Sequence, residues 1–267
     1  MPDRGTILIT GSTDGLGLAC ATDLVAQGAT VLLHGRSEER LRQARAAVGG
    51  TGDAELATYR ADLSSLGAVR ELADRILGDQ DRLDVLVNNA GVVVPERQLS
   101  RDGYELTFAV NYLSHFLLTT LLLPLLERSA PARIVNVASV GQRPIDFDDV
   151  MLERSYEPIR AYCQSKLAQI MFTLELAEKL GDSGVTVNAL HPATLMDTKM
   201  VRDSFGTVMS SVDEGKEATL RLVSSPDLDG VSGCYYDGQR KSTADQQAYD
   251  ADARRRLWEL SEALCGL

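Results

Sequence analysis

Short apolar segments alternate along the chain with longer amphipathic ones. Five of the short segments are rich in branched side chains and do not alternate in polarity, as in parallel strands buried on both faces. They cover residues 7–9, 31–33, 85–87, 134–137 and 185–187. Weaker strands are predicted at 57–61 and 234–236. Apolar residues at three- and four-residue spacing predict helices at 15–27, 38–48, 65–78, 102–128, 158–181, 213–224 and 244–263.

This regular alternation of strands and helices predicts the fold class. It indicates an α/β protein with a single-domain, Rossmann-type, doubly wound parallel sheet and helices on both faces. A glycine-rich turn at 49–52 lies between a helix and a strand, so it is not a linker. The chain shows no internal repeat and no low-complexity segment. We therefore expect one domain over residues 1–267.

Composition and charge narrow the possible partners. The formal net charge is −11, which disfavours nucleic acid and anionic membranes because both require a basic footprint. The first residues lack the pattern of a cleavable signal. The longest apolar stretch, 116–126, is shorter than the roughly 20 residues of a membrane span. We expect a cytoplasmic protein without a membrane partner.

The metal-ligating residue types are scattered. The cysteines show no pair at metal-ligand spacing, and the histidines are isolated: Cys20, Cys163, Cys234, Cys265, His34, His115 and His191. This pattern predicts free thiols in a reducing compartment and no metal site.

The loop at residues 10–17 follows the first strand and opens the first helix. Its glycines allow a sharp turn and a close approach to a pyrophosphate, and the helix N-terminus supplies N–H donors. The alternative is a plain tight turn, but the position at the first strand-to-helix junction favours a dinucleotide site. The candidate cofactor-binding residues here are Gly11, Ser12, Asp14, Gly15, Leu16 and Gly17.

The end of the second strand bears on the choice of cofactor. A carboxylate there would favour NAD(H) by binding the ribose 2′-hydroxyl, whereas this chain has Arg36 followed by Ser37. A guanidinium pairs with a 2′-phosphate through two hydrogen bonds. The alternative is an ordinary surface arginine. The sequence favours NADP(H) over NAD(H).

Two more strand ends contribute candidate cofactor contacts. Asp62 and Leu63 follow the third strand, where a carboxylate can accept from the adenine amino group, although Asp62 could equally be a helix-end residue. Asn88, Ala90 and Gly91 follow the fourth strand, where small residues let a ribose lie against the backbone. Taken alone, they could form an Asn-rich turn.

The candidate catalytic residues lie farther along the chain. Tyr162 and Lys166 are four residues apart in a predicted helix, so they share one face, and the ammonium is expected to lower the pKa of the tyrosine. Such a tyrosine can act as a general acid or base. Ser139 follows the fifth strand and can bind a substrate oxygen. Asn111 is a poor helix-interior residue, which favours a functional role. Alternatively, the pair lies on an exposed helix surface and Asn111 points outward.

These motifs, in this order, resemble the short-chain dehydrogenase/reductase superfamily over nearly the whole chain. The resemblance implies that Tyr162 is the acid/base, that Lys166 lowers its pKa and binds the nicotinamide ribose, and that Ser139 orients the carbonyl. It implies a relay water on Asn111. It also implies nicotinamide contacts from Pro192, Thr194 and Thr198, although Ala193 stands where the family usually has glycine and Thr198 falls one residue late.

The long spacing between Ser139 and Tyr162 resembles the branch of retinol dehydrogenases and WW-domain oxidoreductases. An insert at about 144–160 is expected on the substrate side. The methionine-rich segment at about 194–212 is expected to be a substrate lid or a helix packed on the core. The family often forms dimers or tetramers through helices at 102–128 and 158–181, so a homodimer or homotetramer is possible.

The sequence therefore predicts an oxidoreductase that moves a hydride between NADP(H) and a small carbonyl or alcohol, with ketone or aldehyde reduction favoured. One alternative is a catalytically silent protein that senses the cofactor or regulates another process, because a fold does not guarantee a function. Another is a nucleotide-sugar epimerase, since these also use Tyr-x-x-x-Lys. Epimerases usually have a different glycine spacing and a longer C-terminal substrate domain.

Overall fold

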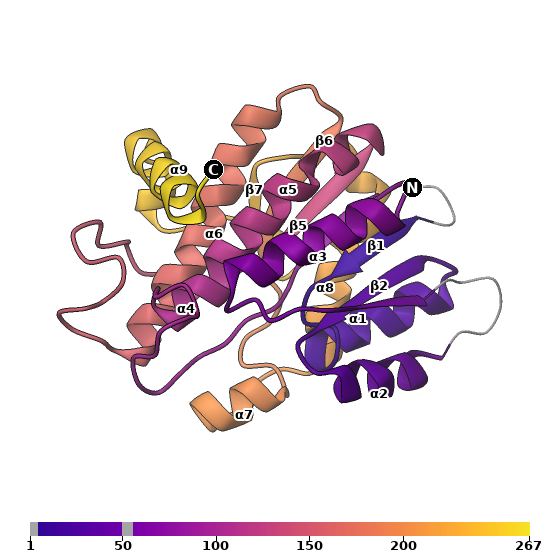
Figure 1. Ribbon diagram of the computed structural model, residues 1–267, viewed down its shortest axis with the longest axis horizontal. Helices are drawn as coiled ribbons and strands as arrows, with labels where there is room; N and C mark the ends of the chain where they lie inside the picture. The colour runs from indigo at the N-terminus through magenta and orange to yellow at the C-terminus, as the bar shows by residue number, and fades with distance from the viewer. Residues whose placement is uncertain (1–4, 50–55) are drawn as a thin grey trace.

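An eight-stranded sheet forms the centre of the protein (Figure 1). The computed structural model describes residues 5–49 and 56–267, so most of the predicted turn at 49–52 lies outside the described residues. The strand order is β3-β2-β1-β4-β5-β6-β7-β8. The strands are β1 (Thr6–Ile9), β2 (Thr30–Gly35), β3 (Leu56–Arg60), β4 (Val85–Asn88), β5 (Ala132–Val137), β6 (Val185–His191), β7 (Cys234–Asp237) and β8 (Arg240–Ser242).

The order of the strands creates the binding crevice. β1 to β7 pair in parallel, and β8 pairs antiparallel with β7. The chain runs outward from β1 to β3 and then returns to place β4 on the other side of β1. In open α/β sheets, ligands bind at the carboxyl ends of the strands at such a reversal. The predicted fold class is confirmed.

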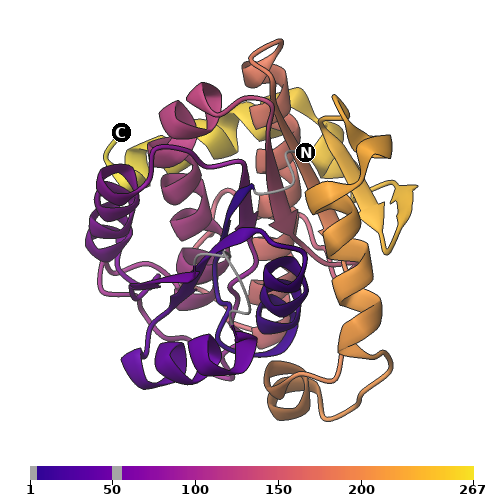
Figure 2. The same ribbon diagram turned by 90° about the vertical axis from the view of Figure 1, so that its right-hand side faces the viewer.

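Helices cover both faces of the sheet (Figure 2). One face packs against α1 (Gly15–Ala26), α2 (Glu38–Val48) and α8 (Val212–Ser224). The other packs against α3 (Leu66–Asp79), α5 (Ser114–Arg128) and α6 (Pro158–Leu180). These bounds lie within one residue of the predicted ones except for the segment ending in α5, because the strong 3.6-residue periodicity marks the buried side of each helix.

The helix predicted over 102–128 begins later than expected, at Leu106. The buried carboxylate of Glu105 caps its first turn by accepting hydrogen bonds from the N–H groups of Thr107 and Phe108, at 2.8 and 2.7 Å. The helix then comprises α4 (Leu106–Phe108), a π-helical turn over Ala109–Leu113, and α5.

Taken together, these turns form one helix that is long and apolar enough to cross a membrane, with a mean hydropathy of 1.5 over its most apolar 18 residues. The sequence alone indicates a shorter apolar stretch, broken by Thr119, Thr120 and Pro124. In the structure, 78% of the helix's most apolar 18-residue window is buried. Packing against α3 and α6 therefore accounts for its composition.

Three features near the C-terminal half differ from the sequence prediction. The helix expected over 244–263 is divided, because Asp245 caps a 3-10 turn (Gln246–Tyr249) and Asp250 caps α9 (Ala251–Cys265). The short β8 was not predicted, and α7 (Lys199–Phe205) forms within the segment expected to be a lid or a packed helix. Their sequence signals are a Gly238-Gln239 hairpin loop and a threonine cap at Thr198 with a glycine at the other end.

The helix α9 lies against α5 and α6 (Figure 1). Trp258 stacks on Phe172 at 5.9 Å and meets Phe116 edge-on at 5.1 Å. Buried Arg254 pairs with Glu175 and Glu178 of α6. Part of the helical surface that the resemblance implies for subunit contacts is therefore covered by the chain's own C-terminal helix.

Candidate active site

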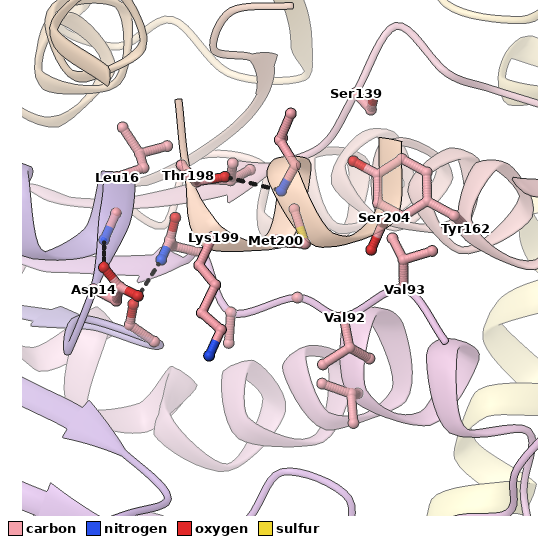
Figure 3. A pocket seen from close by; sticks show the side chains of 18 of the residues that line it. Asp14, Leu16, Val92, Val93, Ser139, Tyr162, Thr198, Lys199, Met200 and Ser204 are labelled. Atoms are coloured by element: carbon pink, nitrogen blue, oxygen red, sulfur yellow. Dashed lines mark hydrogen bonds between the residues drawn. The ribbon is translucent and has the colours of Figure 1, made fainter. Parts of the chain in front are cut away.

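A cavity of about 1060 Å³ lies along the carboxyl edge of the sheet (Figure 3). It is large enough for a dinucleotide together with a substrate, since ordinary ligand pockets are about 300–1,000 Å³. Most of the predicted site residues line it: Gly11, Asp14, Gly15, Leu16, Arg36, Ser37, Asp62, Leu63, Ala90, Gly91, Ser139, Tyr162, Lys166, Pro192, Thr194 and Thr198.

Two predicted cofactor residues with polar side chains are buried behind the cavity instead. The Ser12 hydroxyl accepts a hydrogen bond from the N–H of His34 at 2.9 Å, so it holds the glycine loop to β2. The Asn88 amide donates to Thr119 and Asn136 inside the core. Neither side chain lines the cavity, because both bind other buried groups, so the structure gives these two residues a supporting position.

Asn111 also lies behind the cavity wall and is fully buried. Its Oδ1 accepts from the Val92 N–H at 2.8 Å, and its Nδ2 donates to the Val92 carbonyl and to the Ser165 hydroxyl, at 3.1 and 3.0 Å. Asn111 therefore joins the loop after β4 to α6. It lies within the π-helical turn, a local distortion often found at functional sites.

The glycine loop leaves no room for side chains at two positions. A Cβ at Gly17 would lie 2.4 Å from the Gly11 carbonyl oxygen, and one at Gly11 would lie 2.9 Å from the Ala90 Cα. Gly11 also has a positive φ of 65°. Gly17 does not line the cavity, so its role is to let the loop pack closely on α1. The loop fits a pyrophosphate, because Gly11, Gly15 and the N-terminus of α1 border the cavity without bulky side chains.

We expect Gly17→Ala to destabilise the protein by about 2–4 kcal/mol, because its Cβ clashes with backbone that cannot move freely. Gly78→Ala in α3 is the control, since a Cβ there meets nothing within 4 Å. That change should be neutral or stabilise by up to about 1 kcal/mol. Urea unfolding of both variants measures the difference. Equal stability of the two variants would contradict the close packing.

The end of the cavity near α2 carries positive charge. Arg36, Arg40 and Arg101 line it together with Asp62. Burial raises the pKa of Asp62, but hydrogen bonds from Ser64 and the charges of Arg101 and Arg36 outweigh it, so the net pKa is below its usual value. Arg40 and Arg101 are missed by the sequence prediction. Arg40 could have been found from its position four residues after Arg36, in the first turn of α2.

The other end of the cavity holds the candidate catalytic residues. Ser139 follows β5, and its Oγ accepts from the Gly141 N–H at 3.0 Å. Figure 3 shows Ser139 and Tyr162 next to each other on one side of the cavity. The Lys166 ammonium donates to the Val137 carbonyl at 2.8 Å and to Gln169 Oε1 at 2.9 Å. One ammonium hydrogen is then left for a bound ligand.

The predicted lowering of the tyrosine pKa does not hold in this structure. Burial raises the pKa of Tyr162 to about 12, although hydrogen bonding to Ser139 opposes the shift. Burial lowers the pKa of Lys166 to about 7. The Lys166 ammonium lies 5.7 Å from the centre of the tyrosine ring and donates its hydrogen bonds elsewhere. Desolvation outweighs the hydrogen bond with Ser139, so the pKa of Tyr162 lies above that of an ordinary phenol.

The segment expected to be a lid lies over the cavity. Its base is closed by hydrogen bonds between the Asp197 N–H and the Ser210 carbonyl and between the Met209 N–H and the Leu195 carbonyl, both 3.0 Å. Within it, α7 presents Met200, Ser204 and Phe205 to the cavity. Phe205 meets the Tyr162 ring edge-on at 6.1 Å. The sequence singles out this segment as a lid or a packed helix, but it does not predict the bounds of α7.

The insert contributes less to the cavity than its predicted position implies. Of residues 144–160, all of which the structure describes, only Ile159 lines the cavity. The earlier part packs inward, where Ile145 exchanges backbone hydrogen bonds with the Gln247 amide. The Gln164 amide likewise binds Asp146 and Val150 of the insert.

The residues that the structure describes contain no group of three or more His, Cys, Asp or Glu side chains arranged to hold a metal ion. Ser139, Tyr162 and Lys166 all line the cavity.

The sequence of this chain matches a known protein family. A family model described as short chain dehydrogenase matches residues 5–208. The chain belongs to this family. Mouse (Mus musculus) retinol dehydrogenase 14 is 40% identical over an alignment covering 98% of this chain and 86% of the relative. The chain is thus a short-chain dehydrogenase of the retinol dehydrogenase-like branch, as its motifs imply.

Solved structures share the fold. The structure of an uncharacterized protein from Mycobacterium paratuberculosis matches with a TM-score of 0.81 and 32% identity, covering 98% of this chain and 94% of that one. The complex of Pseudomonas aeruginosa RhlG with NADP matches with a TM-score of 0.72 and 26% identity, covering 87% and 94%.

Proposed function

We propose that this short-chain dehydrogenase is an NADP(H)-dependent oxidoreductase that reduces an aldehyde or ketone to the alcohol, with Tyr162 as the proton donor. One observation carries the proposal. The same continuous cavity has a glycine loop and arginines at one end and Ser139, Tyr162 and Lys166 at the other. A dinucleotide laid along it from the arginines would reach the tyrosine with its nicotinamide.

The mechanism follows from the chemistry of these side chains. When bound, the reduced nicotinamide supplies the hydride. The Ser139 hydroxyl and the Tyr162 phenol are placed to bind one carbonyl oxygen. Because burial keeps the phenol protonated at neutral pH, Tyr162 can donate its proton as charge develops on that oxygen. The remaining hydrogen of the Lys166 ammonium can bind the nicotinamide ribose and stabilise the phenolate that forms.

The cofactor preference rests on the arginines. Arg36 and Arg40 line the end of the cavity near α2, where we expect the adenosine ribose of a bound dinucleotide. A guanidinium favours a 2′-phosphate through paired hydrogen bonds. The structurally similar RhlG complex contains NADP, which supports the binding of a nicotinamide dinucleotide in a cavity of this kind.

The substrate end of the cavity favours an apolar carbonyl compound. Val93, Val140, Ile159, Met200 and Phe205 line it. The name of the mouse relative, a retinol dehydrogenase, is consistent with such a lining. We expect α7 to act as a lid, since the segment's ends are tied together and its helix covers the tyrosine.

Calorimetry with NADPH and NADH, followed by NADPH oxidation at 340 nm with a panel of apolar and polar carbonyls, tests the proposal. We expect NADPH to bind at least tenfold more tightly than NADH, and apolar aldehydes such as retinal to be reduced faster than short polar ones. Binding of neither cofactor would overturn the proposal. Tight NADPH binding without turnover on any carbonyl would favour a regulatory protein that senses the cofactor.

A further inference from the structure

A row of buried polar side chains leads away from Lys166 into the protein core. Lys166, Gln169, His115 and Thr10 are each at most 4% exposed. They come from three elements that are distant in sequence: α6, α5 and the end of β1. Buried polar groups in such positions cost free energy unless each finds a partner, so a connected row of them requires a reason.

Successive members of the row lie within hydrogen-bonding distance. Lys166 Nζ lies 2.9 Å from Gln169 Oε1, and Gln169 Nε2 lies 3.2 Å from His115 Nδ1. On the far side of the ring, His115 Nε2 lies 3.2 Å from Thr10 Oγ1. Thr10 Oγ1 in turn accepts from the N–H groups of Asn89 and Ala90, at 2.9 and 3.0 Å. Asn89 and Ala90 line the cavity directly beside the glycine loop.

The ammonium sets the direction of the hydrogen bonds. Because an ammonium only donates, the Gln169 amide must turn its oxygen to Lys166 and its N–H to His115. The ring then accepts at Nδ1 and carries its proton on Nε2, which faces Thr10 Oγ1, while the Thr10 hydroxyl donates to the Val87 carbonyl at 3.3 Å. Burial lowers the pKa of His115 to about 3, which keeps the ring neutral, as this arrangement requires. The Asn111 carbonyl, 3.0 Å from Nδ1, favours the other tautomer, so the protonation site is diagnostic.

We propose that Gln169 and His115 are positioning residues that hold the Lys166 ammonium and tie it to the loop expected to bind the cofactor phosphates. Their relevance to catalysis rests on the proposed function, but the hydrogen-bond chain itself does not. Without Gln169, Lys166 keeps one hydrogen-bond partner in the part of the chain that the structure describes, the Val137 carbonyl. The titratable groups facing Lys166 are Tyr162 from its own helix and His115 from α5. No carboxylate among residues 5–49 and 56–267 contributes to its pKa.

The ionisation of Lys166 tests the proposal without any cofactor or substrate. The sequence has only five lysines, so lysine labelled with ¹³C at Cε gives a spectrum in which Lys166 is identified by its loss in Lys166→Met. Gln169→Leu removes a hydrogen-bond acceptor from the ammonium. We expect it to lower the midpoint of the Lys166 titration by about one pH unit, because hydrogen bonds to charged groups are strong.

Gln164→Leu is the matched control. Gln164 lies on the same helix and is equally buried, at 1% exposed, but its amide binds the insert. It should destabilise the fold comparably and leave the Lys166 midpoint unchanged. If the Lys166 titration midpoint were the same in Gln169→Leu and in Gln164→Leu, the proposal would be overturned.

The isosteric change Gln169→Glu keeps the proposal testable if the leucine variant does not fold. A carboxylate beside the ammonium should raise the Lys166 midpoint. It can only accept from His115, so it should also move the ring proton from Nε2 to Nδ1, as seen in ¹⁵N spectra of the three histidines. If the His115 ring of the wild-type protein were already protonated on Nδ1, the proposed row of hydrogen bonds would be wrong. If neither cofactor binds but these shifts occur, the proposed function fails and the positioning role of Gln169 stands.

Discussion

Tyr162→Phe should reduce NADPH-dependent carbonyl turnover by about 10²–10⁴-fold, the range that a positioned general acid contributes. The phenol lies beside Ser139 in the cavity and is held protonated by burial, so its removal leaves no proton donor at the substrate oxygen. The ring itself remains in place against Phe205. We therefore expect kcat to fall while the Kd for NADPH changes by less than about threefold, as measured by steady-state kinetics and calorimetry.

Tyr235→Phe provides a control of the same chemistry close by. Tyr235 is also buried, and its hydroxyl donates to the Ser139 carbonyl at 3.1 Å, but the side chain does not line the cavity. Its loss should cost about 1 kcal/mol of stability and less than tenfold in turnover. A Tyr162→Phe enzyme with turnover similar to that of the control would remove Tyr162 from the role of acid.

The fold was predictable because its signals are local and repeated. Five unbroken apolar strands and the periodic helices between them specify a doubly wound sheet. Ser37 and the charged first turn of α2 place a helix start within one residue. The predictions fail where a single side chain redirects the backbone. The Glu105 carboxylate shortens the start of one helix, and Asp250 restarts another.

The site was predictable only as far as sequence spacing reaches. Tyr162 and Lys166 share a helix face, and strand ends meet at one edge of the sheet, so their proximity follows from periodicity. The His115 contact with Gln169 joins two helices more than 50 residues apart, and no spacing reveals it. The pKa of Tyr162 was predicted with the wrong sign for a related reason, because a pattern shows a neighbouring charge but not the depth of burial.

The positions of Asn111 and Asn88 also show that a sequence pattern does not reveal where a side chain points. The sequence singles out Asn111 as a polar residue in an apolar helix, and Asn88 as part of a loop that follows a strand. Their side chains bind other buried groups, in contrast to the cavity-lining Ala90 and Gly91. Whether a side chain points into the cavity depends on the local backbone. Asn111 lies in a π-helical turn, and Asn88 is the last residue of β4.

Arg36→Asp should reverse the cofactor preference. Arg36 is exposed at the cavity end that would take the adenosine ribose. A hydrogen-bonded charge pair contributes about 1.5–3 kcal/mol, so its loss alone weakens NADPH binding by roughly 10–100-fold. The new carboxylate repels the 2′-phosphate further and can bind the two ribose hydroxyls of NADH. We expect the ratio of the two Kd values to change by about 10²–10³-fold in calorimetry at low salt.

The salt dependence and a matched variant separate this effect from a general change in charge. Because Arg36 is exposed, its contribution should weaken as ionic strength rises and the Debye length falls below about 10 Å. Arg45→Asp makes the same change in net charge on α2, but Arg45 does not line the cavity. It should shift both Kd values by less than about threefold and in the same direction. If Arg45→Asp altered the NADPH-to-NADH ratio as much as Arg36→Asp, the preference would reflect the overall field of the protein rather than a guanidinium bound to the 2′-phosphate.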